Sequence, residues 1–357
     1  MIKVFKSWFE RYFSDDEAVI LFLILGAGLL FIIYLGNILA PVIASIILAY
    51  VLQGLVVYLR SKGVNNLAAI YLSYLFFLGT VLGFFFSVLP LVWRQLTSLI
   101  TDMPTIVTKL KKLVFSLQEE YSTIITLQEL DLMLQNLTSS VANLGQWIVS
   151  QSLEGLPIFI TAMIYLIVVP ILVFFFIKDK DKIVGSIVSF LPKDRRLMTQ
   201  VWEEMNRQFA NYVRGKVVEI AIVGGCTYIG FIFMSLNYSA LLAILVGLSV
   251  VIPYIGAVLV TIPVAMIALF QFGLSDAFYY VMLIFLIIQM IDGNVLVPLL
   301  FSEVVNLHPT VIIIAVLFFG GIWGVWGVFF AIPLATMVKA VFTAWPRKTD
   351  SSTKLLS

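Results

Sequence analysis

Long apolar runs dominate the chain, and shorter polar segments separate them. A helix needs about 20 apolar residues to cross the hydrocarbon core of a membrane. Eight runs approach or exceed this length, and Gly36-Asn37 separates the first two; they cover residues 18–35, 38–59, 67–93, 156–177, 217–234, 239–273, 277–301 and 308–345. The pattern predicts an all-α polytopic membrane protein with about eight transmembrane helices.

The two longest runs must contain a break. Residues 239–273 alone would form a helix about 50 Å long at 1.5 Å per residue, whereas the hydrocarbon core is about 30 Å thick. Proline removes a backbone hydrogen bond and glycine permits a sharp bend. We therefore expect long, broken or bent helices, with helix breaks at Pro253, Gly256, Pro298, Gly324, Gly327 and Pro333.

The two broken runs resemble each other. The stretch from Gly256 to Pro263 is echoed by the stretch from Gly327 to Pro333, which is one residue shorter. A single apolar run precedes each of them, and inverted repeats with broken helices recur in secondary transporters. We interpret the C-terminal part as two inverted repeats, with chance likeness as the alternative: residues 217–273 and 277–345.

The segment between the third and fourth runs, residues 94–155, is amphipathic. Its apolar residues recur at spacings of three and four over 96–117 and again over 129–149, as on one face of a helix. Such helices either cover the membrane bundle or pair with partner subunits. A further helix is expected around residues 195–214.

Positively charged residues collect before the first run, between the second and third, between the fourth and fifth, and after the last. Loops rich in Lys and Arg stay in the cytoplasm. We therefore expect both termini and the basic link before residue 217 to be cytoplasmic, and residues 94–155 to be extracytoplasmic. This is the topology of a multi-pass protein of the bacterial inner membrane.

Composition excludes a soluble globular protein and several kinds of site. The chain is 61% hydrophobic and 12% charged, whereas soluble domains are about half apolar and one-quarter charged. The chain has one cysteine, Cys226, so it forms no intrachain disulfide. We interpret its one histidine, His308, as a helix-start residue. Hydrolase, zinc-protease and phosphate-loop motifs are absent, so we expect no enzyme activity, cofactor, metal or nucleic-acid partner.

Asp292 is the clearest candidate for a transport site. It lies inside the seventh apolar run, with Gln289 three residues before it and Asn294 just after it. Ionisable residues at membrane depth are costly and mark substrate or ion pathways. Gly293 and Pro298 loosen the helix and free carbonyl groups for a cation or a polar solute. The alternative is that Asp292 only caps a broken helix or pairs with another helix.

Glu219 is a weaker candidate, near the start of the fifth run. An ion pair with Lys216 or an effect of the helix dipole explains it equally well. Arg214 and Asn211 lie nearby in sequence, and we expect them to line the cytoplasmic mouth of the pathway.

Several motifs together resemble the AI-2E family, also called the autoinducer-2 exporter or PerM-like permease family. They are Ile252-Pro253-Tyr254-Ile255-Gly256, residues 292–298, Val305-Asn306-Leu307-His308-Pro309, Gly320-Gly321, residues 327–333 and Phe176-Ile177-Lys178-Asp179. The resemblance covers essentially the whole chain. It implies eight membrane helices, homo-oligomers (pentamers) and export of small molecules such as autoinducer-2, or, as for some members, sodium(lithium)/proton antiport.

These observations suggest a division of labour along the chain. We expect a secondary transporter in a lipid bilayer that moves a small-molecule or cation substrate, with a structural or scaffolding membrane protein acting through its outer helices as the alternative. The expected segments are a scaffold of three helices (1–93), extracytoplasmic helices (94–155), a fourth helix with a basic cytoplasmic link (156–216), a transport core (217–345) and a cytoplasmic tail (346–357).

Overall fold

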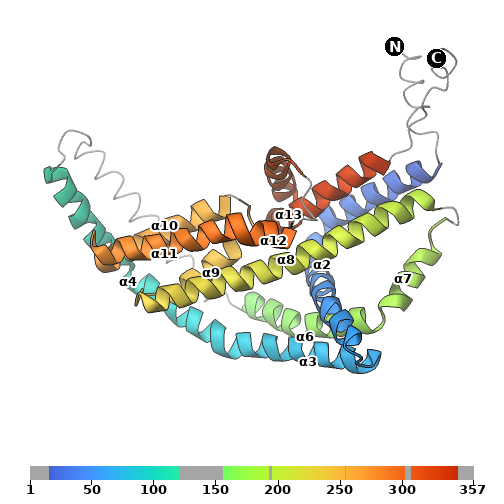
Figure 1. Ribbon diagram of the computed structural model, residues 1–357, viewed down its shortest axis with the longest axis horizontal. Coiled ribbons are helices and arrows are strands. Elements are labelled where there is room, and N and C mark those ends of the chain that lie inside the picture. The colour runs from blue at the N-terminus through green and yellow to red at the C-terminus, as the bar shows by residue number, and fades with distance from the viewer. Residues whose placement is uncertain (1–15, 121–155, 193–194, 254, 302–306, 345–357) are drawn as a thin grey trace, which may run out of the picture. The chain divides into compact units, whose positions relative to one another are not determined.

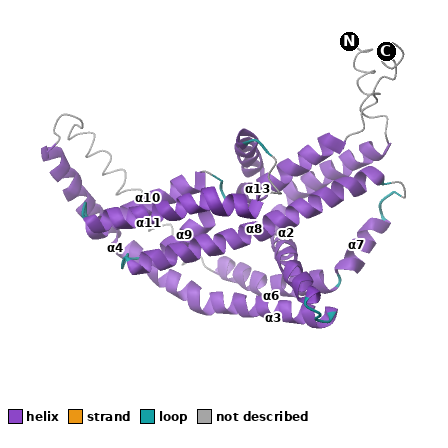
Figure 2. Cartoon of the chain, in the orientation of Figure 1, coloured by secondary structure: helices purple, strands orange, loops and turns teal. Residues whose placement is uncertain are grey.

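The computed structural model describes residues 16–120, 156–192, 195–253, 255–301 and 307–344 (Figure 1). These ranges consist of helices joined by short turns and contain no strand (Figure 2). The helices are α2 Asp16–Ser61, α3 Asn66–Gly83, α4 Leu89–Glu120, α6 Leu156–Lys178, α7 Lys180–Ser189, α8 Arg196–Phe233, α9 Ser239–Ser249, α10 Ile255–Phe272, α11 Asp276–Ile291, α12 Val297–Phe301 and α13 Pro309–Ala344, with π-helical segments η1 Phe84–Val88 and η2 Asp292–Leu296.

The predicted all-α membrane fold is confirmed. Among the described residues, six helical segments are long and apolar enough to cross a membrane: Ile38–Ser61, Asn66–Lys109, Arg196–Phe233, Ile255–Phe272, Asp276–Phe301 and Pro309–Thr343. Three shorter apolar helices accompany them, Val19–Phe31, Met163–Lys178 and Ser239–Ser249. The number of eight crossings stays a prediction.

Two predicted helix boundaries are wrong. Gly36-Asn37 does not separate the first two runs, because α2 continues through it. A glycine inside a helix costs only about 1 kcal/mol, and here its missing side chain makes room for Trp323: a Cβ at Gly36 would lie 2.4 Å from the indole Nε1. Likewise α8 joins the expected helix at 195–214 to the run at 217–234 without interruption.

The amphipathic segment begins as predicted. Helix α4 extends from the third apolar run into it as far as Glu120. The second predicted amphipathic stretch, 129–149, lies outside the described residues.

The chain forms two compact units, each assembled from separate segments. One combines residues 1–70, 169–215 and 301–357, and the other combines residues 71–168 and 216–300. Helix α8 therefore contributes its first half to the first unit and its second half to the second. The predicted division by role into five segments stays a prediction.

In the first unit, α8 and α13 pack against α2. Leu21 of α2 is buried with Met198 and Val201 of α8. The carboxylate of Glu17 accepts a hydrogen bond of 2.7 Å from the backbone N–H of Met198 in the first turn of α8, where N–H groups have no partner within the helix. Side chains near the start of α2 thus hold the start of α8.

An aromatic stack lies beside the bend in α13. The ring of Phe330 is stacked on Phe209 of α8 and on Trp323, with centroid distances of 5.8 and 5.7 Å. Gly324, next to Trp323, has φ 59° and ψ −137°, a conformation that interrupts the helix and that glycine adopts without steric cost.

The predicted break at Pro333 is absent, because α13 remains helical through this residue. Proline has no N–H, so the carbonyl of Phe329, four residues earlier, loses its helical partner. The hydroxyl of Tyr212 replaces that partner, donating to the Phe329 oxygen at 3.1 Å. A side chain of α8 therefore compensates for the proline in α13.

We expect Tyr212→Phe to lower the melting temperature of the purified protein, because it leaves the part-buried Phe329 carbonyl without this donor, at a cost of about 1 kcal/mol. In a Pro333→Ala background the restored N–H takes over this carbonyl, so the same substitution should cost clearly less. Thermal unfolding of the four proteins in detergent measures the difference. Equal decreases in melting temperature in both backgrounds would show that the tyrosine hydroxyl does not compensate for the hydrogen bond that Pro333 cannot make.

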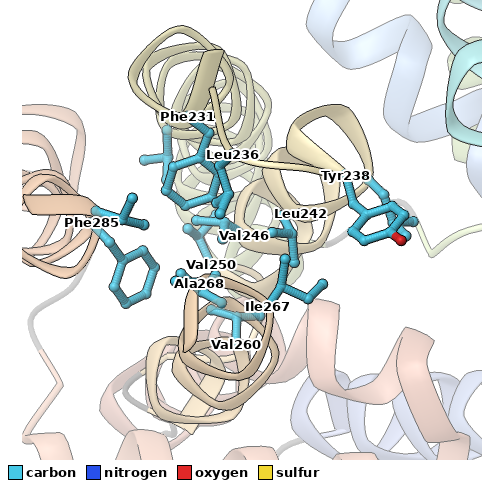
Figure 3. Close-up of a cluster of buried hydrophobic side chains, with 14 residues drawn as sticks. Phe231, Leu236, Tyr238, Leu242, Val246, Val250, Val260, Ile267, Ala268 and Phe285 are labelled. Atoms are coloured by element: carbon cyan, nitrogen blue, oxygen red, sulfur yellow. The ribbon is translucent and has the colours of Figure 1, made fainter. Parts of the chain in front are cut away.

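In the second unit, α9 and α10 fold against each other as a helical hairpin. Their apolar faces form a buried cluster with Phe231 of α8 and Phe285 of α11 (Figure 3). At the open end of the hairpin, the side-chain amide of Gln271 accepts from the N–H of Asn237 and donates to the carbonyl of Ser235, at 2.7 and 2.8 Å. The first long run is thus a hairpin rather than a bent span.

At the break between α9 and α10 and at the break within α13, a glycine packs directly against a backbone carbonyl. Pro253 lies in the turn between α9 and α10. A Cβ at Gly256 would lie 1.8 Å from the carbonyl oxygen of Ser249, and a Cβ at Gly327 would lie 1.8 Å from that of Phe319. The two sequence echoes therefore share a local geometry that only glycine permits.

Candidate functional site

A π-helical turn places Asp292 at an irregular point of its helix. Pro298 has no N–H for the carbonyl of Asn294, and the preceding N–H, that of Val297, bonds to the carbonyl of Asp292 five residues earlier. The segment η1 precedes Pro90 in the same way, with the N–H of the intervening residue bonded five residues back. Such π-bulges occur frequently at functional sites.

Asp292 and Gln289 share one face of this helix. The Oδ1 atom of Asp292 and the Nε2 atom of Gln289 are buried and have no hydrogen-bond partner within the described residues. Buried polar atoms usually have a partner, so each such exception calls for an explanation. Asn294 is exposed and donates from Nδ2 to the carbonyl of Met290 at 2.9 Å, so the structure does not bring it to Asp292.

Glu219 and Lys216 form a buried ion pair on α8. The Lys216 Nζ lies 2.6 Å from Glu219 Oε2, and the two side chains are only 5% and 2% exposed. The same ammonium group donates to the carbonyl of Val250 at 2.7 Å. Val250 is the C-cap of α9, at the start of the hairpin turn, so Lys216 binds where the broken helix presents a carbonyl without a helical partner.

Asp292 lies in the same compact unit as this ion pair. Helices α8 and α11 approach closely, since a Cβ at Gly230 would lie 2.9 Å from Ile284. The second unit therefore contains one ammonium and two carboxylates, of which Glu219 is paired at the hairpin turn and Asp292 lies at the helix break. We call Lys216, Glu219, Asp292 and the Val250 carbonyl the charged cluster.

Arg214 and Asn211 lie in the first unit, although both are close to Lys216 in sequence. The Nε of Arg214 donates to the carbonyl of Tyr50 at 3.3 Å, and the Tyr50 hydroxyl donates to Asn206 at 2.7 Å. Their role at a pathway mouth stays a prediction.

Sequence reasoning did not select Lys216 or Val250 as site residues. Lys216 precedes an apolar run and has a glutamate three residues later, which is the usual pattern of an interfacial ion pair. The missed signal was the length of α8: Lys216 lies in the interior of a 38-residue helix and not at a helix start. Val250 contributes through its backbone, which no side-chain pattern reveals.

The charged cluster has the groups needed to hold a cation or a polar solute. Carboxylate and carbonyl oxygens bind small hard cations, and a carboxylate beside an ammonium also binds hydroxyl or amino groups. Intramembrane charges of this kind usually face the bundle interior or a water-filled cavity.

Known proteins resemble the chain over nearly its full length. A family model described as the AI-2E family transporter matches residues 19–347. PerM of Escherichia coli (strain K12), by its name a candidate permease, is 47% identical over 346 residues, which cover 97% of this chain and 98% of PerM. YueF of Bacillus subtilis (strain 168), named as a candidate transport protein, is 28% identical over 323 residues, covering 87% of this chain and 85% of YueF. The chain therefore belongs to the AI-2E transporter family.

Proposed function

We propose that this protein is a secondary transporter that exports a small solute, such as autoinducer-2 or a related small molecule, along a path bordered by the charged cluster. The observation that carries the proposal is the Lys216–Glu219 pair at the hairpin turn. Both charges are buried, and α8 contains no other Asp, Glu, Lys or Arg after Gly215. Nothing in a purely structural bundle requires them, since replacing a buried ion pair by apolar side chains is often neutral or stabilising.

The irregular backbone near the charged cluster supports the same proposal. The hairpin turn at Pro253 and the π-helical turn at Asp292 both leave main-chain groups outside regular helical bonding. At membrane depth, non-helical backbone is tolerated only where protein or a water-filled cavity surrounds it. Broken helices beside buried charges are typical of transporters whose binding sites lie near the bilayer midplane.

Reconstitution tests the proposal directly. The purified protein is inserted into liposomes, and efflux of radiolabelled or enzymatically assayed small solutes is followed with and without sodium and proton gradients. A saturable flux that exceeds that of protein-free liposomes supports the proposal. If no small solute and no cation crosses faster than in protein-free liposomes, the transporter proposal fails and the scaffolding alternative is favoured.

A second candidate function is sodium(lithium)/proton antiport. Two carboxylates on the apolar helices of the second unit, Glu219 and Asp292, favour it, because acids at membrane depth can exchange a proton for a small cation. The liposome assay separates it from solute export: an antiporter moves protons when sodium or lithium is added without any organic solute.

The proposed topology has both termini in the cytoplasm and the segment after α4 outside, in the bacterial inner membrane. In a Cys226→Ala background, a cysteine at Ser122 should react with a membrane-impermeant thiol reagent in intact cells. A cysteine at Ser186, exposed on α7, should react only after the membrane is opened. Labelling of both from the same side would contradict this topology. We further propose that the protein works as a homo-oligomer held by its first three helices.

A further inference from the structure

Helix α7 carries an apolar face although it is only 10 residues long (Figure 1). After a charged first turn, its polar and apolar residues separate at the helical step of about 100° per residue. Gly185, Ser186 and Ser189 lie on one side. The apolar residues share the other side: Ile183, Val184, Ile187, Val188 and, at the C-cap, Phe190. A helix this short is marginal in water and needs a cover for its apolar face.

The described residues do not provide that cover. No residue of α7 is buried. The side chain of Ile187 is 60% exposed and that of Phe190 is 89% exposed, which is the highest value among the large apolar side chains that the structure describes. The occupant of this face therefore comes from outside the described part of the chain.

An exposed apolar stripe on α6 leads directly to α7. Ile171 and Phe175 are 48% and 47% exposed, and Lys178, three residues further, ends the helix on the same side. The Lys178 ammonium lies over the ring of Phe174, 5.4 Å from its centroid. A lysine in this place keeps its stem against apolar surface and its charge at the level of the headgroups. Since α7 begins two residues later, it starts at the membrane surface.

Basic side chains lie at both ends of α7. Lys180 and Lys182 are exposed in its first turn. At the other end, Nη1 of Arg195 donates to the Val188 carbonyl at 3.3 Å, which holds the guanidinium beside the helix C-terminus. Residues 178–196 contain six basic and three acidic side chains. This net positive charge would repel a second copy of the same face, whereas it complements anionic phospholipid headgroups above their acyl chains.

We infer that α7 is an in-plane membrane anchor, whose apolar face enters the boundary of the acyl chains and whose basic ends bind anionic phospholipid headgroups. In the proposed topology these headgroups belong to the cytoplasmic leaflet. The polar side of the helix, with Ser186, stays in water. The inference goes beyond the proposed function, because it does not depend on which solute the protein moves.

The test places a fluorophore on each side of the helix. In a Cys226→Ala background, Ile187→Cys or Ser186→Cys is labelled with the environment-sensitive NBD group. The full-length protein is then reconstituted into vesicles of phosphatidylcholine, with or without phosphatidylglycerol. We expect nitroxide-labelled acyl chains to quench the label on the apolar side and not the label on the polar side. Quenching should be severalfold stronger with phosphatidylglycerol, and high salt should remove this difference by screening the charges.

Matched charge variants identify the groups responsible. Lys180→Gln/Lys182→Gln removes two positive charges from α7; Lys182 pairs with an aspartate at 3.1 Å, yet its side chain is 84% exposed. Each basic residue near an anionic surface strengthens binding about fivefold, so quenching in phosphatidylglycerol vesicles should fall to the level in phosphatidylcholine. Arg60→Gln/Lys62→Gln removes the same charge from exposed residues at the end of α2 and should change nothing. Phe190→Ser should weaken quenching in both kinds of vesicle, because it removes apolar area and no charge.

Three results would overturn the inference. If lipid nitroxides do not quench the label at Ile187, a second copy of this chain or another protein covers the face. If they quench the labels at Ile187 and Ser186 equally, α7 does not lie in the membrane plane. If quenching is the same in both kinds of vesicle and the lysine variant changes nothing, headgroup charge has no role.

These results are independent of the transport assay. A protein that binds anionic lipid through α7 but moves no solute or cation in liposomes sinks the proposed function and leaves the anchor intact. A protein that transports while the label at Ile187 stays unquenched does the reverse.

Discussion

Replacing Gly256 with alanine is expected to destabilise the protein more than any other single methyl addition in the second unit. The added Cβ would lie 1.8 Å from the carbonyl oxygen of Ser249, so the backbone of the hairpin turn has to move. Overpacking of this kind costs about 1–3 kcal/mol and sometimes more. Because the turn also presents the Val250 carbonyl to Lys216, transport should fall together with the melting temperature.

The chain offers matched comparisons for this substitution. A Cβ at Gly225, inside α8, would meet nothing within 4 Å, so Gly225→Ala should be neutral or slightly stabilising because alanine favours a helix. Gly327→Ala should behave like Gly256→Ala, since it meets the carbonyl of Phe319 at the same distance. If Gly256→Ala melts within experimental error of Gly225→Ala, the glycine does not close the hairpin as the structure describes.

Asp292→Asn is expected to reduce transport at least tenfold while leaving the melting temperature close to that of the parent. The amide keeps the shape and most of the hydrogen-bonding capacity of the carboxylate, but it loses the negative charge at the helix break. A tenfold effect corresponds to about 1.4 kcal/mol, a modest share of what a buried charge interaction can supply. Initial rates in liposomes, normalised to the amount of inserted protein, give the comparison.

Asp276→Asn serves as the control for the same chemical change on the same helix. Asp276 lies in the first turn of α11, where its charge only complements the helix dipole. We expect parent-like rates for it. If Asp292→Asn inserts normally and transports as fast as Asp276→Asn, then Asp292 has a structural role and the proposed pathway is misplaced.

Hydrophobic periodicity and turn chemistry were sufficient to predict the membrane class and the breaks near Pro253 and Gly324. They were insufficient wherever a distant contact decided the local structure. Gly36 continues a helix because Trp323 packs on it, and Pro333 continues a helix because the Tyr212 hydroxyl takes the carbonyl that proline frees. No sequence window contains both partners of either contact.

The candidate site was predictable to a similar extent. Asp292 stands out because a charge within an apolar run is rare, and Glu219 was noticed for the same reason. Lys216 was taken as an interfacial residue because its run of apolar neighbours begins only after it. The role of Val250 depends on a main-chain carbonyl, and that carbonyl is available only because α9 ends there.

The continuity of α8 fixes the spacing of the two charges that it carries into the second unit. Lys216 and Glu219 are three residues apart, so an uninterrupted helix holds them on one face, where the ammonium reaches both the carboxylate and the Val250 carbonyl. One residue inserted between them would turn the carboxylate away from the ammonium by about 100°, with no charge lost. The spacing between the two charges is thus as much a part of the site as their identity.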